Sequence, residues 1–468
     1  MTMKIAAVIN FLILGLAASA APVRIGTFKV DATPPLGSPL AYDAMIGVDA
    51  PLSCRGIVLL GAGDPIVLAA IDWIGLSNDG HLEFRKALAK GASTRVERVT
   101  MHTLHQHDAP RCDFSADALL ARHGMGGKKF NVAHARKVIA SVAAAVAKAV
   151  ETAEPVSHLG VGAGQVRMVA SNRRILGPDG KVQHTRYTAT SDPAIRAFPA
   201  GTIDSRLCLI TFWKGGQALA ALSYYATHPQ SYYRTGLANP DFPGMARNQR
   251  EKETGVPHIH FTGAGGNIGA GKWNDGAKEK RQILADRVAA GMKAAWEATA
   301  REPLGSGDVH WIVQPVLLPV GTHLKEETLA AVVEVETEPL EKRYLAAKVL
   351  TWLRRCQREE PLELSCLALR QARILHMPGE LFVEYQLYAQ AVRPDLVVAM
   401  AAYGDYAPGY ICTEAAYSQG GYEADERSSM VSPQVESVLK GAICRLLDAP
   451  DPPRGKTEQT PGKESIDP

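Results

Sequence analysis

The chain has 468 residues, 46% of them hydrophobic, so it can bury a large core, and its length corresponds to two or three domains at roughly 150 residues each. Its formal net charge is only +3, and no segment forms a basic stripe, which argues against nucleic acid as a partner.

The first twenty residues are typical of a secretory signal peptide. They contain one early lysine, an apolar run from Ile5 to Leu16 and the small residues Ala18 to Ala20. The run is shorter than the about 20 residues that cross a bilayer. We therefore expect cleavage after residue 20, a secreted or periplasmic protein and no transmembrane segment after cleavage. The alternative is an uncleaved anchor.

Apolar periodicity predicts the elements that follow. Residues 55–77 predict two strands around a Gly-rich turn, and a helix should follow from Ser77 to Lys90. Residues 95–103 predict a strand that leads into three histidines, and apolar residues recur at helical spacing in 136–150.

The second half alternates strands with helices. Helical spacing recurs from Leu284 to Ala295, and a charged helical stretch near 338–359 suggests an insertion over 322–360. No fixed-period repeat is present. Six further strands are predicted, at 206–213, 218–227, 258–263, 308–320, 371–377 and 395–403. This order predicts a mixed α/β fold, with mixed β-sheets layered with helices.

The cysteines and the C-terminal end give weaker information. Seven cysteines form no C-x-x-C pair, so thiolate zinc sites are poorly supported, and Cys356 with Cys366 is the nearest candidate for a disulfide. Residues 449–468 are rich in proline and charge, so we expect a disordered tail.

Three histidines follow one predicted strand within six positions: His102, His105 and His107. If the strand continues through them, His105 and His107 share a face and His102 points the other way. Such a pair could bind a metal ion, or it could be polar surface. His258 and His260 have the same spacing, so the pattern alone is not specific.

Other metal-ligand types also follow predicted strands. His228 stands between a strand and a proline, Glu380 lies in a Pro-Gly turn, and residues 403–425 are rich in tyrosine and glycine. Zinc favours imidazole nitrogen and carboxylate oxygen. Ligands from distant strand ends fit an open catalytic site better than a compact structural one.

Five motifs then occur in order between Asp31 and Glu423: VDATPPLGSPLAYD, LHQHDAP, THPQSYYRTGLANPDFPGMAR, MPGELFVE and GYICTEAAYSQGGYE. In these motifs the chain resembles the N-terminal domain of the neutral/alkaline (non-lysosomal) ceramidase family. The resemblance covers nearly the whole mature chain. It implies a single large ceramidase-like catalytic domain over residues 21–448, an amidase activity and a place in lipid metabolism.

The resemblance also implies a catalytic zinc ion and the roles of particular residues. Its ligands would be His105, His228, Glu380 and Tyr410. Three further residues would assist the carbonyl chemistry: His107, Tyr422 and Arg173, although Arg174 adjoins the last.

The chain departs from the family at the nucleophile. Where the family has Gly-Asp-x-Ser-Pro, this chain has Gly266 to Ala270, so Gly269 replaces the serine and Asn267 the aspartate. We also expect no C-terminal sandwich domain after residue 448, which members of the family usually carry. We expect a relative of the family in which Gly269, Asn267 and Asp241 contact substrate, with capping of the next helix as the alternative for Asp241.

The predicted function is an exported zinc-dependent hydrolase that cleaves an amide (N-acyl) or ester bond by zinc-activated water. Its expected partner is a small-molecule or lipid-like substrate, and the sequence indicates no oligomeric state. The alternative is a non-catalytic zinc-binding scaffold that recognises a ligand, which the loss of the serine favours.

Overall fold

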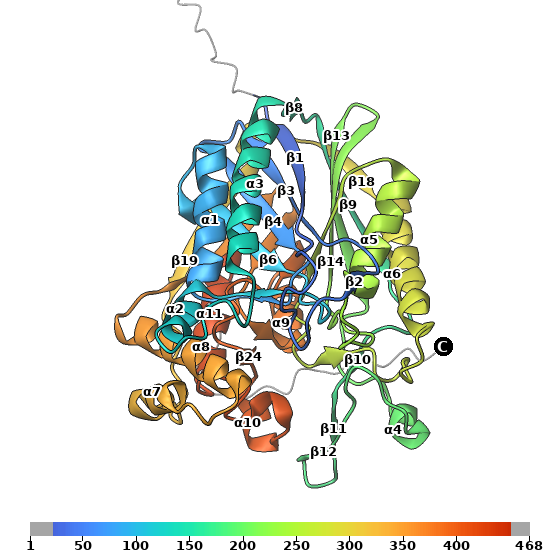
Figure 1. Cartoon of the computed structure of the whole chain (residues 1–468). Coiled ribbons are helices and arrows are strands. Elements are labelled where there is room, and N and C mark those ends of the chain that lie inside the picture. Colours follow the sequence, from blue (N-terminus) through green and yellow to red (C-terminus); the bar gives the residue numbers. More distant parts are fainter. Residues whose placement is uncertain (1–21, 451–468) are drawn as a thin grey trace, which may run out of the picture.

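The computed structural model describes residues 22–450, so the predicted signal peptide and residues 451–468 of the predicted tail lie outside the described residues. The fold is mixed α/β, as predicted, with three larger sheets between layers of helices (Figure 1). Within residues 22–450 no helix is long and apolar enough to cross a membrane.

The first sheet has the order β6-β4-β3-β1-β8. Its neighbours are antiparallel except β4 and β6, which are parallel because the helix α1 connects them. The bounds are β1 Arg24–Asp31, β3 Ser53–Leu60, β4 Ile66–Ile71, α1 Asp79–Ala92, β6 Val99–Thr103 and β8 Glu154–Pro155.

The second sheet has the order β16-β14-β13-β9-β18, and its one parallel pair, β14 with β16, is joined through α5. The third has the order β19-β20-β21-β23, and α9 joins its parallel pair, β21 with β23. The bounds in the second sheet are β9 His158–Gln165, β13 Arg206–Lys214, β14 Gln217–Tyr225, α5 Asp241–Thr254, β16 His258–Thr262 and β18 Ala300–Pro303. Those in the third are β19 Val309–Val316, β20 Leu362–Leu369, β21 Ala372–His376, α9 Val383–Val392 and β23 Val397–Ala401.

One structural unit therefore occurs three times. Each unit has three antiparallel strands, a helix and a fourth strand parallel to the third. The sequence shows no matching repeat, because the unit is repeated in topology and not in residue identity.

Helices cover the outer faces of the sheets. α1 and α3 (Val132–Glu151) pack on the first sheet, α5 and α6 (Lys280–Glu297) on the second, and α9 and α11 (Val435–Leu447) on the third. Figure 1 shows α1 and α3 on one side of the molecule and α5 and α6 on the other. The inner faces form a common apolar core that includes Ile57, Phe212 and Leu367.

The fourth strands of the units meet at their C-terminal ends. Thr103 N donates to Tyr403 O at 3.0 Å, Ala402 N to Thr262 O at 2.9 Å, and Thr262 Oγ1 to Leu104 O at 2.9 Å. The loops that follow these strands are thus held together, and they carry most of the candidate site.

Most predicted elements are confirmed, including the β3–β4 hairpin, α1, α3 and α6. Strands β1, β9 and β20 were not predicted. The charged stretch forms α8 (Leu340–Gln357), and α7 (Glu326–Glu334) precedes it. Both helices lie between the adjacent antiparallel strands β19 and β20.

Two expectations are wrong. All seven cysteines are free, because Cys356 ends up on α8 and Cys366 inside β20. The strand before the histidines ends at Thr103, and His105 has a φ of 69°, so the chain turns there. His105 and His107 therefore belong to a loop, and strand alternation does not describe them.

Candidate metal centre

His105 is the first residue of the site, in the loop after β6. Its side chain is 1% exposed, and its Nδ1 lies 2.6 Å from Ile74 O. A carbonyl oxygen only accepts, so Nδ1 carries the proton and the lone pair is on Nε2. That atom lies 3.4 Å from Glu380 Oε2.

His228 repeats this arrangement from the second unit, in the loop after β14. Its Nδ1 donates to Gly265 O at 2.9 Å, which leaves the lone pair on Nε2, 3.2 Å from Glu380 Oε2. Burial lowers the pKa of His228, which favours the neutral imidazole that a metal ion requires.

Glu380 comes from the third unit, where Gly379 shapes the turn after β21. Gly379 has a φ of 59°, and a Cβ there would lie 2.7 Å from Gly409 O, so only glycine fits. Burial raises the pKa of Glu380, but positive charge on the His105 and His228 imidazoles outweighs it and holds that pKa well below its usual value; with neutral imidazoles a metal ion would have to supply this positive charge. Oε1 accepts a hydrogen bond from Tyr406 Oη.

The three groups together fit a metal ion. Glu380 Oε2 is buried and has no hydrogen-bond partner in the described chain, although two imidazole nitrogens lie within 3.4 Å of it. Two lone pairs and an ionised carboxylate cannot satisfy one another, and a cation would pair with all three.

Tyr410 is placed next to Glu380 by the short parallel pair β22 (Glu380–Leu381) and β24 (Tyr410–Ile411). Its Oη accepts hydrogen bonds from Arg173 Nη1 and from Tyr422 Oη, both at 3.2 Å. Burial and Glu380 raise the pKa of Tyr410, and Arg173 opposes them. Its role as a ligand stays a prediction.

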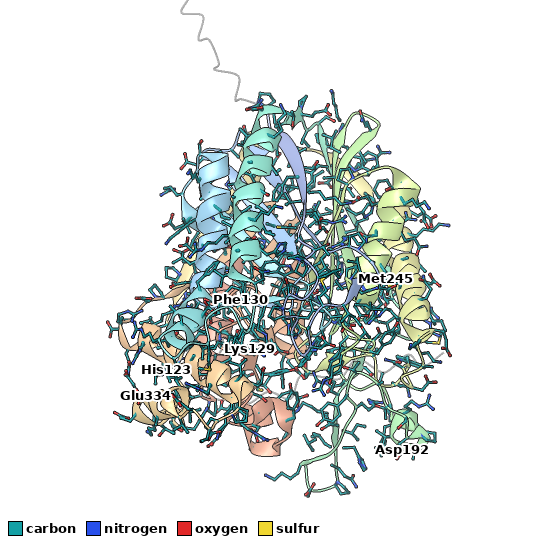
Figure 2. All side chains as sticks on the ribbon, viewed as in Figure 1. His123, Lys129, Phe130, Asp192, Met245 and Glu334 are labelled. Carbon is teal, nitrogen blue, oxygen red and sulfur yellow. The ribbon has the colours of Figure 1, made fainter. Side chains whose placement is uncertain are left out.

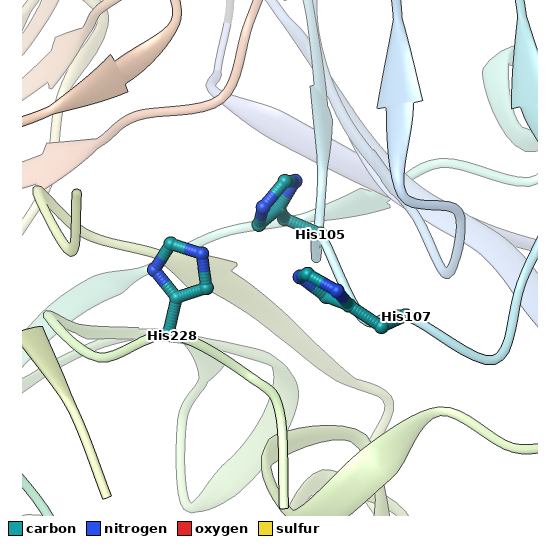
Figure 3. Close-up of side chains that lie close together, drawn as sticks. All are labelled: His105, His107 and His228. Carbon is teal, nitrogen blue, oxygen red and sulfur yellow. The ribbon is translucent and has the colours of Figure 1, made fainter. Parts of the chain in front are cut away.

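His107 lies in the same cluster. Ligand nitrogens of His105, His107 and His228 are within 4.8 Å of one another and could hold a metal ion (Figure 3). However, His107 Nδ1 accepts from Gln230 Nε2 at 2.8 Å, so its Nε2 carries the proton. That Nε2 is buried without a partner, so His107 presents a donor where the two ligand candidates present lone pairs.

Arg173, and not Arg174, reaches the site. The Arg173 guanidinium lies 5.3 Å from the Tyr422 ring and 5.9 Å from the Tyr410 ring, in addition to its bond to Tyr410 Oη. Arg174 instead binds Glu423 Oε2 at 3.2 Å and Ala416 O at 3.1 Å. The sequence could not separate the two arginines, because they are adjacent.

Gly269 lies beside Arg173, on the short strand β17 (Ile268–Gly269), which pairs with β10 (Ser171–Asn172). A Cβ at Gly269 would be 3.4 Å from Arg173 Cγ, an ordinary contact, so a side chain would fit. A side chain at this position would therefore pack against the stem of Arg173.

The other two residues expected to bind substrate are engaged elsewhere. Asn267 Oδ1 accepts from Val383 N at 2.9 Å and its Nδ2 donates to Glu384 Oε2 at 2.8 Å, so the side chain holds the start of α9. Asp241 accepts from Phe242 N at 2.7 Å and from Ser231 N at 3.0 Å. These bonds hold Asp241 at the start of α5, but they do not make it a cap, because Pro240 is the N-cap residue and has no side-chain cap hydrogen bond.

Several residues of the site were missed by sequence reasoning. Tyr403 stacks on His105 with 4.6 Å between ring centroids, Tyr406 binds Glu380, and Tyr42 Oη lies 3.0 Å from His107 Nδ1. The tyrosine-rich segment was noticed, but which tyrosines face inward depends on local backbone, including a φ of 58° at Tyr403. Gln230, two positions after His228, carried no signal of its own.

No protein-family model and no curated protein sequence matches the chain. Solved structures do match, two ceramidases among them. The crystal structure of neutral ceramidase from Pseudomonas aeruginosa has a TM-score of 0.65 and 18% identity, over 92% of this chain and 75% of that one. A ceramidase complexed with C2 has a TM-score of 0.65 and 17% identity, over 94% and 77%. The chain therefore has a ceramidase-like fold.

Proposed function

We propose that the protein is a zinc-dependent hydrolase that cleaves an amide (N-acyl) or ester bond. One observation carries the proposal: the Nε2 atoms of His105 and His228 lie 3.4 and 3.2 Å from Glu380 Oε2, which is buried and has no hydrogen-bond partner among the described residues. Zinc in this position would polarise a substrate carbonyl and lower the pKa of water to about 7.

The chain's own residues supply the donors for carbonyl chemistry. His107 presents Nε2–H in the cluster, held in that tautomer by Gln230. Arg173 and Tyr422 place a guanidinium and a phenol at Tyr410 Oη. Preorganised donors of this kind stabilise the negative charge that develops on a carbonyl oxygen under attack.

The nucleophile in this proposal is water. Residue 269 is glycine, so the loop offers no hydroxyl at that position. Hydrolysis would then proceed without an acyl-enzyme, and a chelator should abolish it.

A scaffold that binds zinc and recognises a ligand is the second candidate, favoured by the missing serine. The unpartnered His107 Nε2–H argues against it, since a purely structural ion has no need of an adjacent buried donor.

The test uses the full chain, purified and analysed for zinc, and then assayed with a panel of amides and esters with and without chelator. One bound zinc and chelator-sensitive hydrolysis would support the hydrolase. Tight zinc binding without hydrolysis of any compound would favour the scaffold, and a covalent acyl intermediate would exclude water as the nucleophile. Export remains part of the proposal, and a secreted product that begins at Ala21 would support it.

A further inference from the structure

Lys348 on α8 is a buried cation without a paired anion. The residue is 8% exposed, and within residues 22–450 its ammonium forms no hydrogen bond or ion pair; its contact is with the Tyr406 ring, 4.9 Å from the centroid. Lys342 on the same helix is exposed and pairs with Glu338 at 2.6 Å. Burial lowers the pKa of Lys348, the usual sign that the charge is costly there.

The ammonium lies next to the candidate metal centre. The Tyr406 ring that it contacts is 5.2 Å from the His105 ring, and Tyr406 Oη donates to Glu380. Glu380 is close enough to act on Lys348 electrostatically. One aromatic side chain therefore connects Lys348 to both ligand candidates.

Arg111 is a second cation at this place, four residues after His107. Its Nε is buried and has no partner in the described part of the chain. Its Nη1 lies 3.2 Å from Glu341 Oε1, and its positive charge acts on Lys348. Like charges repel, so Arg111, which has its own ion pair with Glu341, adds to the cost of a charged Lys348.

The nearby carboxylates are largely engaged. Glu341 is shared between Arg111 and Lys129, which is labelled in Figure 2. Asp405 pairs with Arg355 at 2.7 Å. Burial raises the pKa of Asp113 to about 7, so its charge is incomplete near neutral pH. These carboxylates therefore have other partners, and none forms an ion pair with the Lys348 ammonium within residues 22–450.

The position of α8 also indicates a function. It lies in residues 317–361, which connect the adjacent antiparallel strands β19 and β20, where a turn of two residues would suffice. This long connection places Lys348 beside the site.

We propose that Lys348, together with Arg111, forms a subsite for an acidic group on the substrate, so that the hydrolysed compound is an acidic amide such as an N-acyl amino acid. The assignment rests on the proposed hydrolase function. An ammonium and a guanidinium edge both donate to a carboxylate, and charge-assisted hydrogen bonds are the strong ones.

The experiment compares two substrates that differ only in charge, an N-acylglycine and the corresponding N-acylglycinamide, with the zinc-loaded full chain. We expect kcat/KM to be about tenfold or more higher for the acid. Lys348→Met, which keeps the apolar stem, should lower kcat/KM for the acid about ten- to hundredfold and leave the amide within about twofold. Lys348→Arg should retain most of the preference, and the exposed control Lys342→Met should change neither.

Calorimetric binding of the same two compounds separates this proposal from the hydrolase proposal. Acid-selective binding that Lys348→Met abolishes would support the subsite even if neither compound is hydrolysed. Equal turnover or equal binding of acid and amide, or an equal loss of both in Lys348→Met, would overturn the subsite whatever the outcome for catalysis.

Discussion

The chain contains two histidine pairs with the same spacing, and only one of them belongs to a candidate metal centre. His258 and His260 lie inside β16, where their partners are the hydroxyls of Thr254 at 3.2 Å and Ser223 at 2.9 Å. His105 and His107 lie beyond a strand end, in a loop that turns at a φ of 69°. The two pairs have the same spacing in the sequence but different backbone conformations.

The difference shows what distinguishes a ligand from a structural histidine. His105 has its Nδ1 fixed by a backbone carbonyl and its Nε2 directed at Glu380, whereas the β16 pair has no carboxylate within salt-bridge distance. Burial lowers the pKa of His258 to about 4 and that of His260 to about 3, so both stay neutral in the folded protein. The second partner of each imidazole, and not the H-x-H spacing, identifies the metal centre.

Zinc content should distinguish the two histidine pairs most clearly. Glu380→Gln and His105→Ala should each weaken zinc affinity by at least about a hundredfold, because changes to groups that merely support a ligand already cost 10- to 100-fold. His260→Gln should keep full occupancy. Competition with a chromogenic chelator measures all three, and equal affinities would remove the distinction between the pairs.

The other pair should contribute to acid sensitivity, as other buried histidines do. The folded-state pKa of His260 is about 3, below its ordinary value of 6.5, so the unfolded chain takes up the proton first as the pH falls. Its contribution to stability is complete above pH 6.5 and is lost progressively below it, by about 2 kcal/mol between pH 6.5 and 5. Urea unfolding of His260→Gln at pH 7 and 5 should show a smaller decrease than wild type, and an identical decrease would count against this assignment.

Removing the hydrogen-bond donors at His107 Nδ1 tests whether His107 is a proton donor or a metal ligand. Gln230→Leu combined with Tyr42→Phe removes both groups that can donate to Nδ1 and releases the tautomer, so kcat/KM should fall about tenfold while zinc content stays at one per chain. If zinc content falls in parallel with activity, His107 is a third ligand and not a donor.

The smallest expected effect is on stability, from alanine substitution at two glycines of one loop, Gly266 and Gly269. A Cβ at Gly269 meets its nearest neighbour at 3.4 Å, so Gly269→Ala should change stability by no more than about 0.5 kcal/mol. At Gly266 it would lie 2.3 Å from Glu380 O, so Gly266→Ala should lower the melting temperature clearly and displace the ligand candidate. Equal melting temperatures for the two variants would contradict this placement of the loop.

Sequence reasoning reached the strands and helices whose apolar period is regular, and it brought His105, His228 and Glu380 forward from distant motifs. It failed where the local backbone conformation determines how a side chain is oriented. Nothing in the residue types near position 105 signalled a left-handed turn, and the carbonyls of Ile74 and Gly265 that fix the two imidazoles belong to residues chosen for other reasons. The threefold repetition of topology was also invisible, because apolar strands of different sequence satisfy the same unit.

The three ligand candidates come from three different units: His105 from the first, His228 from the second and Glu380 from the third. Strand pairing within a unit is comparatively local, but the ion requires groups more than a hundred residues apart along the chain. High-affinity zinc binding should therefore require that all three units have folded and packed together. A chain in which only two units have folded would have no high-affinity site. Zinc would therefore bind late in folding, after the third unit has packed against the other two.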